Sequence, residues 1–84
     1  MPIRLALIGA GGISQRHMAG YATIKKKEPD LFDLVAVCDA DQKRAEAAAD
    51  EVAGWQAERP RVFTEVDALL QDGRADAADI CTCK

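Results

Sequence analysis

Four short apolar runs alternate with three longer segments of helical periodicity along the 84-residue chain. The runs are 3–8 (IRLALI), 34–38 (LVAVC), 61–63 (RVF) and 77–82 (AADICT), and each is bounded by glycine, proline or an acidic residue. Short apolar runs with such boundaries predict β-strands. The run 3–8 is apolar almost throughout, which is typical of a strand covered on both faces, as in parallel sheets.

The segment 13–27 carries the first helical pattern. The positions that recur at helical spacing are Ile13, His17, Tyr21 and Ile24. Pro29 and Asp30 follow and are expected to end the helix. The basic cluster Lys25, Lys26 and Lys27 is answered nearby by acidic residues, so we interpret it as a solvated helix end rather than a binding patch.

Two further helices are predicted from capping residues. Asp41 is placed to act as N-cap of an alanine-rich helix that Gly54 terminates. Thr64 and Asp67 fit the capping pattern that often precedes a short helix, and Gly73 follows as its terminator. The second helix is therefore expected to end at Gly54 and the third to start from Thr64.

The resulting order of elements is β-α-β-α-β-α-β. Strands that alternate with helices pair in parallel, with the helices on the sheet faces. A chain of 84 residues has room for one domain at most. The sequence thus predicts an α/β protein with a Rossmann-type doubly wound parallel sheet, a single domain over 1–84 that is truncated after the fourth strand.

A glycine-rich turn joins the first strand to the first helix. Gly9, Gly11 and Gly12 precede Ile13 and Ser14, which makes the pattern G-x-G-x-x-S, with serine where the dinucleotide fingerprint has a third small residue. Glycine allows a tight turn and lets a pyrophosphate approach the backbone, and the first N–H groups of the helix point at the ligand. We therefore expect a dinucleotide at Gly9, Gly11, Gly12 and Ile13.

An acidic residue, Asp39, follows the second strand directly. A carboxylate at this position accepts hydrogen bonds from the ribose hydroxyls of the adenosine half and repels the extra phosphate of NADP. NAD is therefore the expected cofactor, with NADP as the alternative. Arg44 is a candidate contact for that phosphate, although its position three residues into a helix favours a surface role.

Charge and hydropathy exclude two classes of partner. Eleven basic residues against 14 acidic ones give a net charge of −3, and the basic stripe of a nucleic-acid-binding protein is absent from the sequence. No run approaches the about 20 apolar residues that span a bilayer. The first apolar run is interrupted by glycines and lacks a signal-peptide cleavage site. We expect no nucleic acid, no membrane and a cytoplasmic location.

Other catalytic and metal motifs are absent from the sequence. Cys38, Cys81 and Cys83 lack the C-x-x-C spacing of zinc and redox sites, and we interpret Cys38 and Cys81 as buried thiols. The glycines are not followed by the Lys-Ser/Thr of a P-loop. His17, the single histidine, lies on the apolar stripe of its helix and is expected to be structural. We therefore predict no metal site and no catalytic residue.

Three segments, LALIGAGGISQRHMAGY (5–21), LVAVCDADQKRAEAAADE (34–51) and VFTEVDALLQDGRADAADICT (62–82), together resemble the N-terminal domain of the Gfo/Idh/MocA oxidoreductases. The resemblance implies nicotinamide-cofactor contacts at Gly9, Gly11, Gly12, Ile13 and Asp39, with Thr82 near the nicotinamide side. In the family that threonine is usually followed by proline, whereas Cys83 and Lys84 follow it here. The family's catalytic Glu-Lys-Pro stretch and its substrate domain come later than the last residue of this sequence.

The leading interpretation is the nicotinamide-binding portion of an oxidoreductase acting on a sugar, cyclitol or related hydroxyl compound, without catalysis by this stretch alone. The alternative is a non-catalytic nucleotide-binding module or a partner subunit. It is motivated by the last strand, whose open edge predicts self-association or pairing with another chain. A methyltransferase that binds S-adenosylmethionine shares the glycine loop and the acidic residue, but the two-helix rhythm and the segment ADICT (78–82) favour the oxidoreductase.

Overall fold

The predicted alternation of strands and helices is confirmed by a computed structural model, which describes residues 3–9 and 12–80, with the backbone alone over 12–17. The elements are β1 (Ile3–Ile8), α1 (Gly12–Lys27), β2 (Phe32–Cys38), α2 (Gln42–Ala53), β3 (Arg61–Phe63), α3 (Val66–Asp72) and β4 (Ala77–Ile80). β2 begins two residues earlier than its apolar run suggested. The described part of the fourth strand ends at Ile80.

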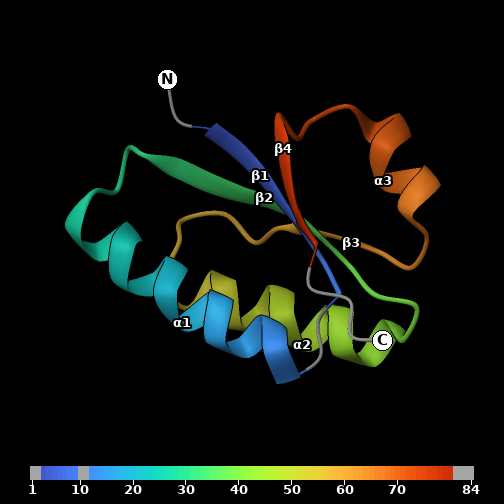
Figure 1. The fold of residues 1–84 in the computed structure, drawn as a ribbon, viewed down its shortest axis with the longest axis horizontal. Helices are drawn as coiled ribbons and strands as arrows, with labels where there is room; N and C mark the ends of the chain where they lie inside the picture. Colours follow the sequence, from blue (N-terminus) through green and yellow to red (C-terminus); the bar gives the residue numbers. More distant parts are fainter. Residues whose placement is uncertain (1–2, 10–11, 81–84) are drawn as a thin grey trace.

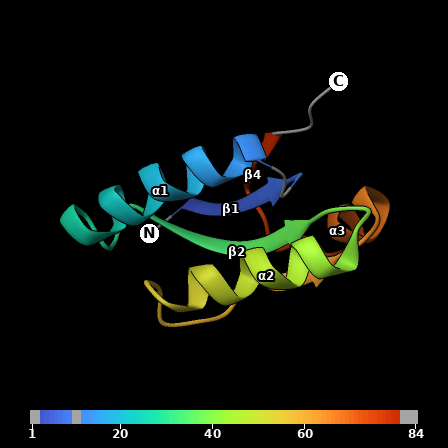
Figure 2. The same cartoon turned by 90° about the horizontal axis from the view of Figure 1, so that it is seen from below.

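The four strands form one parallel sheet in the order β3-β2-β1-β4. Figure 1 shows α1 and α2 side by side against one face of the sheet and α3 against the other. The view from below in Figure 2 shows the same arrangement, with α1 and α2 running along β1 and β2. The expected doubly wound α/β architecture is therefore confirmed.

The pairing of β1 with β2 contains a register shift. Leu5 pairs with Leu34, whereas the next residue, Ala6, pairs with Ala36. Val35 is thus an extra residue in β2, and an extra residue changes which face the following side chains point to. As a result Leu34 and Val37, three positions apart, both pack in the core under α1 and α2.

Each face of the sheet has its own apolar core. Under α1 and α2 the buried residues are Leu7, Met18, Phe32, Leu34, Val37, Ala45, Ala48, Ala49 and Val52. Under α3 they are Ala6, Ile8, Ala36, Cys38 and Leu69. The three alanines of the first group leave little side-chain bulk on the inner face of α2, which lets that helix lie close to the sheet. The larger core therefore lies on the face that carries the first two helices.

The helix caps were predicted correctly at three positions and wrongly at one. Asp41 is the N-cap of α2, Gly54 is its C-cap, and Gly73 ends α3 with a left-handed backbone at φ 69°. The predicted start of α3 at Thr64 is wrong, because the N-cap is Glu65, without a side-chain bond. The first helical hydrogen bond runs from the N–H of Leu69 to the carbonyl of Glu65, so α3 starts one residue later than expected.

The interpretation of the three lysines as a solvated helix end is wrong for Lys25. This side chain is buried, and its ammonium group donates to the carbonyl oxygen of Phe32 and to a carboxylate oxygen of Asp33, 2.6 Å away. It also lies 5.3 Å from the centre of the Phe32 ring. The early start of β2 brings these acceptors to the end of α1, while Lys26 and Lys27 remain exposed.

Polar contacts hold β4 against the rest of the sheet. The Arg4 guanidinium donates to both carboxylate oxygens of Asp76. The N–H of Arg4 also donates to this carboxylate, and the N–H of Asp76 donates to the carbonyl oxygen of Arg4. Hydrogen bonds from Arg4 lower the pKa of Asp76. The Tyr21 hydroxyl of α1 donates to Asp79 in β4. The fourth strand is thus tied both to its neighbour β1 and to a helix of the larger core.

The larger core predicts a strong contrast between two leucine truncations. Leu34→Ala removes a fully buried side chain and is expected to lower the free energy of unfolding by about 2–5 kcal/mol. Leu70→Ala truncates a side chain that is 64% exposed and is expected to cost less than about 0.5 kcal/mol. Urea unfolding followed by Trp55 fluorescence measures both variants. Equal losses would contradict the described core.

Candidate nucleotide site

Gly9, directly after β1, has a backbone conformation that favours glycine, in keeping with the tight turn expected there. Gly9 has φ 91°, a conformation that L side chains rarely adopt. Its N–H donates to the carbonyl oxygen of Cys38 at 2.6 Å, which joins the ends of β1 and β2. α1 then begins at Gly12. Gly11 and the side chain of Ile13 lie outside the described part of the chain.

Asp39 stands at the same edge of the sheet as Gly9. It follows Cys38 directly, and its N–H donates to the carbonyl of Phe63 at 3.1 Å, which extends the sheet towards β3. The side chain is partly exposed, and its Oδ1 accepts a hydrogen bond from the N–H of Asp41 at 2.8 Å. This short turn orients the carboxylate. The structure therefore brings together Gly9, Gly12 and Asp39 at the carboxyl ends of the strands.

Asp41 has more contacts at this edge than its predicted role as N-cap implied. Its carboxylate accepts from the N–H of Lys43 at 2.9 Å and lies 3.8 Å from Nε of Arg44. Its own N–H is the donor to Asp39. The sequence carried a signal for this, because two aspartates separated by one residue before a helix are typical of an Asx turn followed by an N-cap.

Cys38 behaves as the buried thiol that was predicted. It is 2% exposed, and burial raises the pKa of its thiol, with the nearby carboxylates of Asp39 and Glu65 acting in the same direction. A neutral, buried thiol is a poor nucleophile. Cys38 therefore contributes packing beneath the site rather than chemistry in it.

Several other predicted positions lie outside the described residues: Thr82, Cys81, Cys83 and the side chain of His17. Within 3–9 and 12–80 no group of three or more potential metal-ligating side chains is found. Over the same residues, no helix has both the length and the apolar character needed to cross a membrane.

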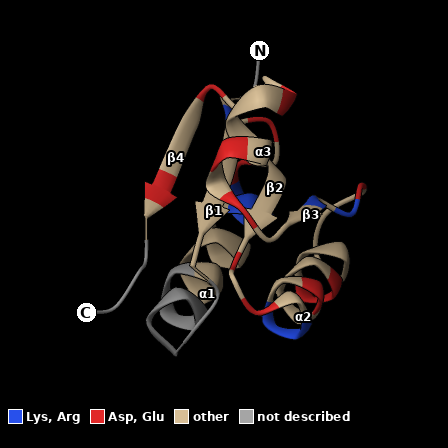
Figure 3. Ribbon diagram, turned by 90° about the vertical axis from the view of Figure 1, so that its right-hand side faces the viewer, with Lys and Arg blue, Asp and Glu red and all other residues tan. Residues whose placement is uncertain are grey.

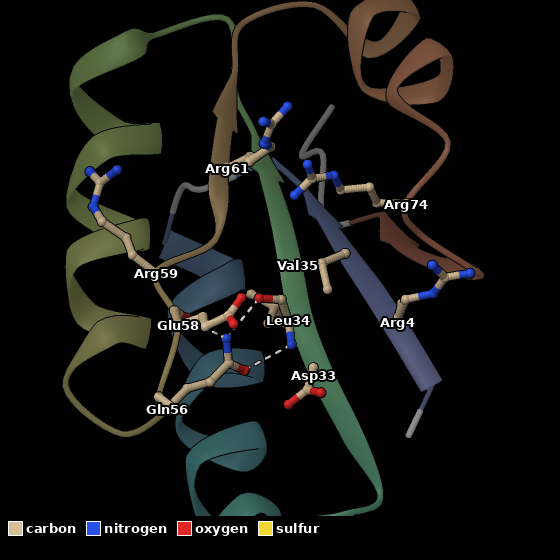
Figure 4. A pocket seen from close by; sticks show the side chains of 10 residues that line it. Arg4, Asp33, Leu34, Val35, Gln56, Glu58, Arg59, Arg61 and Arg74 are labelled. Carbon is tan, nitrogen blue, oxygen red and sulfur yellow. Dashed lines mark hydrogen bonds between the residues drawn. The ribbon is translucent and has the colours of Figure 1, made fainter. Parts of the chain in front are cut away.

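A hollow of about 470 Å³ lies away from the edge with Gly9 and Asp39, towards the amino ends of the strands (Figure 4). Its lining residues are Arg4, Asp33, Leu34, Val35, Gln56, Ala57, Glu58, Arg59, Arg61 and Arg74. Each of the four arginines is ion-paired: Arg4 with Asp76, Arg59 with Glu46 and Asp50, and Arg61 and Arg74 with the shared Asp72.

The Gln56 amide in this hollow is also engaged. It accepts from the N–H of Leu34 and donates to the carbonyl of the same residue, both at 2.8 Å. Figure 4 shows Arg59 directed towards α2, away from the centre of the hollow. These contacts satisfy the polar groups of the chain itself, so the hollow is a poor candidate for the principal ligand site.

The edge with Gly9 and Asp39 has the chemistry of a dinucleotide site. Backbone N–H groups at the start of α1 and the positive end of its dipole suit a pyrophosphate. An oriented carboxylate at the end of β2 suits a pair of ribose hydroxyls. Together with the strand order 3-2-1-4, these features define a dinucleotide-binding Rossmann domain.

The chain belongs to the Gfo/Idh/MocA family, because residues 3–84 match the family model described as "Oxidoreductase family, NAD-binding Rossmann fold". The resemblance noted from the three sequence segments is thereby confirmed. NAD is accordingly the cofactor of this domain, as its sequence predicted.

Individual relatives agree with this assignment. D-glucoside 3-dehydrogenase of Escherichia coli (strain K12) is 31% identical over 81 residues, covering 96% of this chain and 20% of the relative. D-apiose dehydrogenase of Paraburkholderia graminis is 34% identical over 77 residues, 92% of this chain and 18% of the relative. The chain thus spans about one fifth of these curated relatives.

A solved structure shows the same fold. The WlbA dehydrogenase from Bordetella pertussis, in complex with NADH and UDP-GlcNAcA, superposes with a TM-score of 0.77 at 29% identity. The superposition covers 98% of this chain and 22% of WlbA.

Two glycine substitutions are expected to have opposite effects. Gly9→Ala places a side chain at φ 91° and is expected to destabilise the domain by about 1–3 kcal/mol. Gly20→Ala lies inside α1, where an added Cβ meets no atom within 4 Å, and is expected to stabilise it by about 0.5–1 kcal/mol. Thermal unfolding measures both. A stabilising Gly9→Ala would contradict the backbone described for the turn.

Proposed function

We propose that residues 1–84 form the NAD-binding portion of a longer dehydrogenase that acts on a hydroxyl-bearing carbon of a sugar or related polyol. The observation that carries the proposal is the oriented carboxylate of Asp39 beside the positive-φ turn at Gly9. The relatives described above as dehydrogenases of a D-glucoside and of D-apiose support the substrate class. NAD, when bound, supplies the hydride acceptor.

The chain's own residues bind and orient the cofactor in this proposal. In it the pyrophosphate is bound by the backbone of Gly9, Gly11, Gly12 and Ile13. Asp39 binds the adenosine ribose, and Thr82 is assigned to the nicotinamide side. Asp39 favours NAD over NADP, because a 2′-phosphate brought against its carboxylate is repelled. NADP is therefore the weaker ligand in this proposal.

Catalysis needs a proton acceptor within hydrogen-bond reach of the substrate hydroxyl. We assign no such residue to this chain and infer that residues 1–84 bind NAD without turning over substrate. The base and the substrate-binding surface then belong to the remaining polypeptide of the longer enzyme. We also propose that the protein is located in the cytoplasm. Fractionation of cells that produce the tagged protein tests this location.

Removing the Asp39 carboxylate tests the cofactor site. Asp39→Ala removes charged hydrogen bonds to ribose, and we expect NADH affinity to fall about 5- to 30-fold, with a smaller loss for NADPH. Calorimetric titration of the 84-residue chain measures both affinities. Asp67→Ala, an exposed carboxylate on α3, is the matched control and is expected to leave them unchanged.

Equal losses for both cofactors would sink the assignment of Asp39 to the ribose. Saturable binding of neither cofactor by the folded parent chain would contradict the binding role itself. Turnover of a sugar or cyclitol by the purified chain would contradict the inference that catalysis needs further polypeptide.

A second candidate role is that of a subunit that pairs through β4. This strand is bonded to β1 alone among the described strands, and Ile80 in it is 67% exposed. An open apolar edge strand invites pairing with another strand. Sedimentation velocity is expected to show concentration-dependent association that Ile80→Lys weakens. A monomer at all concentrations would rule this role out for the chain by itself.

A further inference from the structure

Asp41 contacts both Asp39, the carboxylate expected to bind the ribose, and Arg44, the candidate contact for a 2′-phosphate. Its N–H holds Oδ1 of Asp39, one oxygen of its carboxylate caps α2 at Lys43, and the other lies 3.8 Å from Nε of Arg44. Asp39 belongs to the short connection between β2 and α2, and Lys43 and Arg44 belong to the first turn of α2. In Figure 3 this connection is acidic and leads directly into a basic first turn of the helix.

The charges in this connection bear on cofactor choice. Arg44 is exposed and lies in the first turn of α2, three residues after Asp41 and five after Asp39, which makes it the nearest arginine along the chain to the carboxylate expected to bind the ribose. A guanidinium is well suited to phosphate. The carboxylate of Asp41 competes for that guanidinium and adds a second negative charge beside Asp39, which opposes a phosphate further.

We propose that Asp41 is a specificity-determining residue, which holds Arg44 in an ion pair and thereby disfavours NADP. The inference rests on the proposed function, since it concerns the adenosine end of the same cofactor site. It goes beyond the direct role of Asp39, because Asp41 acts through the placement of Arg44 and through its own charge.

The capping role and the charge of Asp41 can be separated by substitution. Asparagine is as good an N-cap as aspartate, so Asp41→Asn keeps the oxygen that accepts from Lys43 while removing the charge. The N–H that holds Asp39 belongs to the backbone and is retained. Asp41→Ala loses the cap as well as the charge, so the difference in stability between Asp41→Ala and Asp41→Asn reports the cost of the cap alone.

The test is the ratio of NADPH to NADH affinity in calorimetric titrations. Asp41→Asn is expected to shift this ratio about two- to fivefold towards NADPH, the range expected for an exposed charge pair. Asp50→Asn removes the same charge further along α2, where Asp50 pairs with Arg59, and is expected to leave the ratio unchanged. Arg44→Ala combined with Asp41→Asn is expected to abolish most of the gain.

A second readout needs no cofactor. The NMR signal of the Arg44 Nε–H is expected to shift and its solvent exchange to accelerate in Asp41→Asn, but not in Asp50→Asn. An unchanged signal overturns the restraint on Arg44 whether or not a cofactor binds.

The binding outcomes separate the two proposals. A parent chain that binds NADH, with an affinity ratio unaltered by Asp41→Asn, overturns the role of Asp41 and leaves the proposed function standing. A folded parent chain that binds neither cofactor overturns the proposed function and cofactor selectivity together.

Discussion

The parallel pairing of β1 with β2 is the constraint on which the rest of the structure depends. β1 lies between β2 and β4, so its backbone groups are bonded on both sides, and both cores are built on this central pair. The extra residue at Val35 turns Val37 into the core under α1 and α2. The same pairing ends with the Gly9–Cys38 bond, which places the glycine turn beside Asp39. Core and site are therefore set by one strand pair.

α2 serves both stability and recognition, through different residues. Its alanines pack on the sheet, and its N-terminal Asp41 satisfies backbone donors that the helix leaves unpaired. The residue that caps the helix also orients the carboxylate of Asp39 through its backbone N–H. A substitution at the start of α2 consequently affects both the adenosine end of the site and the stability of the helix. Variants that retain the cap are needed to separate these two effects.

The described residues account for the cofactor side of the proposed dehydrogenase site. The backbone donors suit the pyrophosphate of the cofactor, and the oriented carboxylate suits its ribose. These two parts of the cofactor are recognised by the protein but do not react. β4 lies next to β1, with Ile80 paired with Ile8 and Asp79 bound by Tyr21, so the described end of β4 lies beside the end of β1 that leads to Gly9. The chain spans about one fifth of the curated relatives, so the proposed function leaves the substrate side of the site to other polypeptide.

The sequence by itself determined the features that have local causes. Neighbouring residues determine the glycine turn at Gly9, the N-cap at Asp41, the left-handed stop at Gly73 and the order of strands and helices. The order predicted the parallel topology, and three sequence segments carried the family resemblance. Asp39 could be singled out for the same reason, because it stands at the end of an apolar strand.

Tertiary structure alone decided the features that join distant parts of the chain. The burial of Lys25 depends on acceptors in β2. The extra residue at Val35 depends on the register with β1. The attachment of β4 depends on the pairing of Arg4 with Asp76, 72 positions along the chain. The start of α3 at Val66 rather than after Thr64 belongs with these, since the local capping pattern was not followed by the fold. Local residue patterns report the conformations available to a short segment, whereas partners brought together by folding select among them.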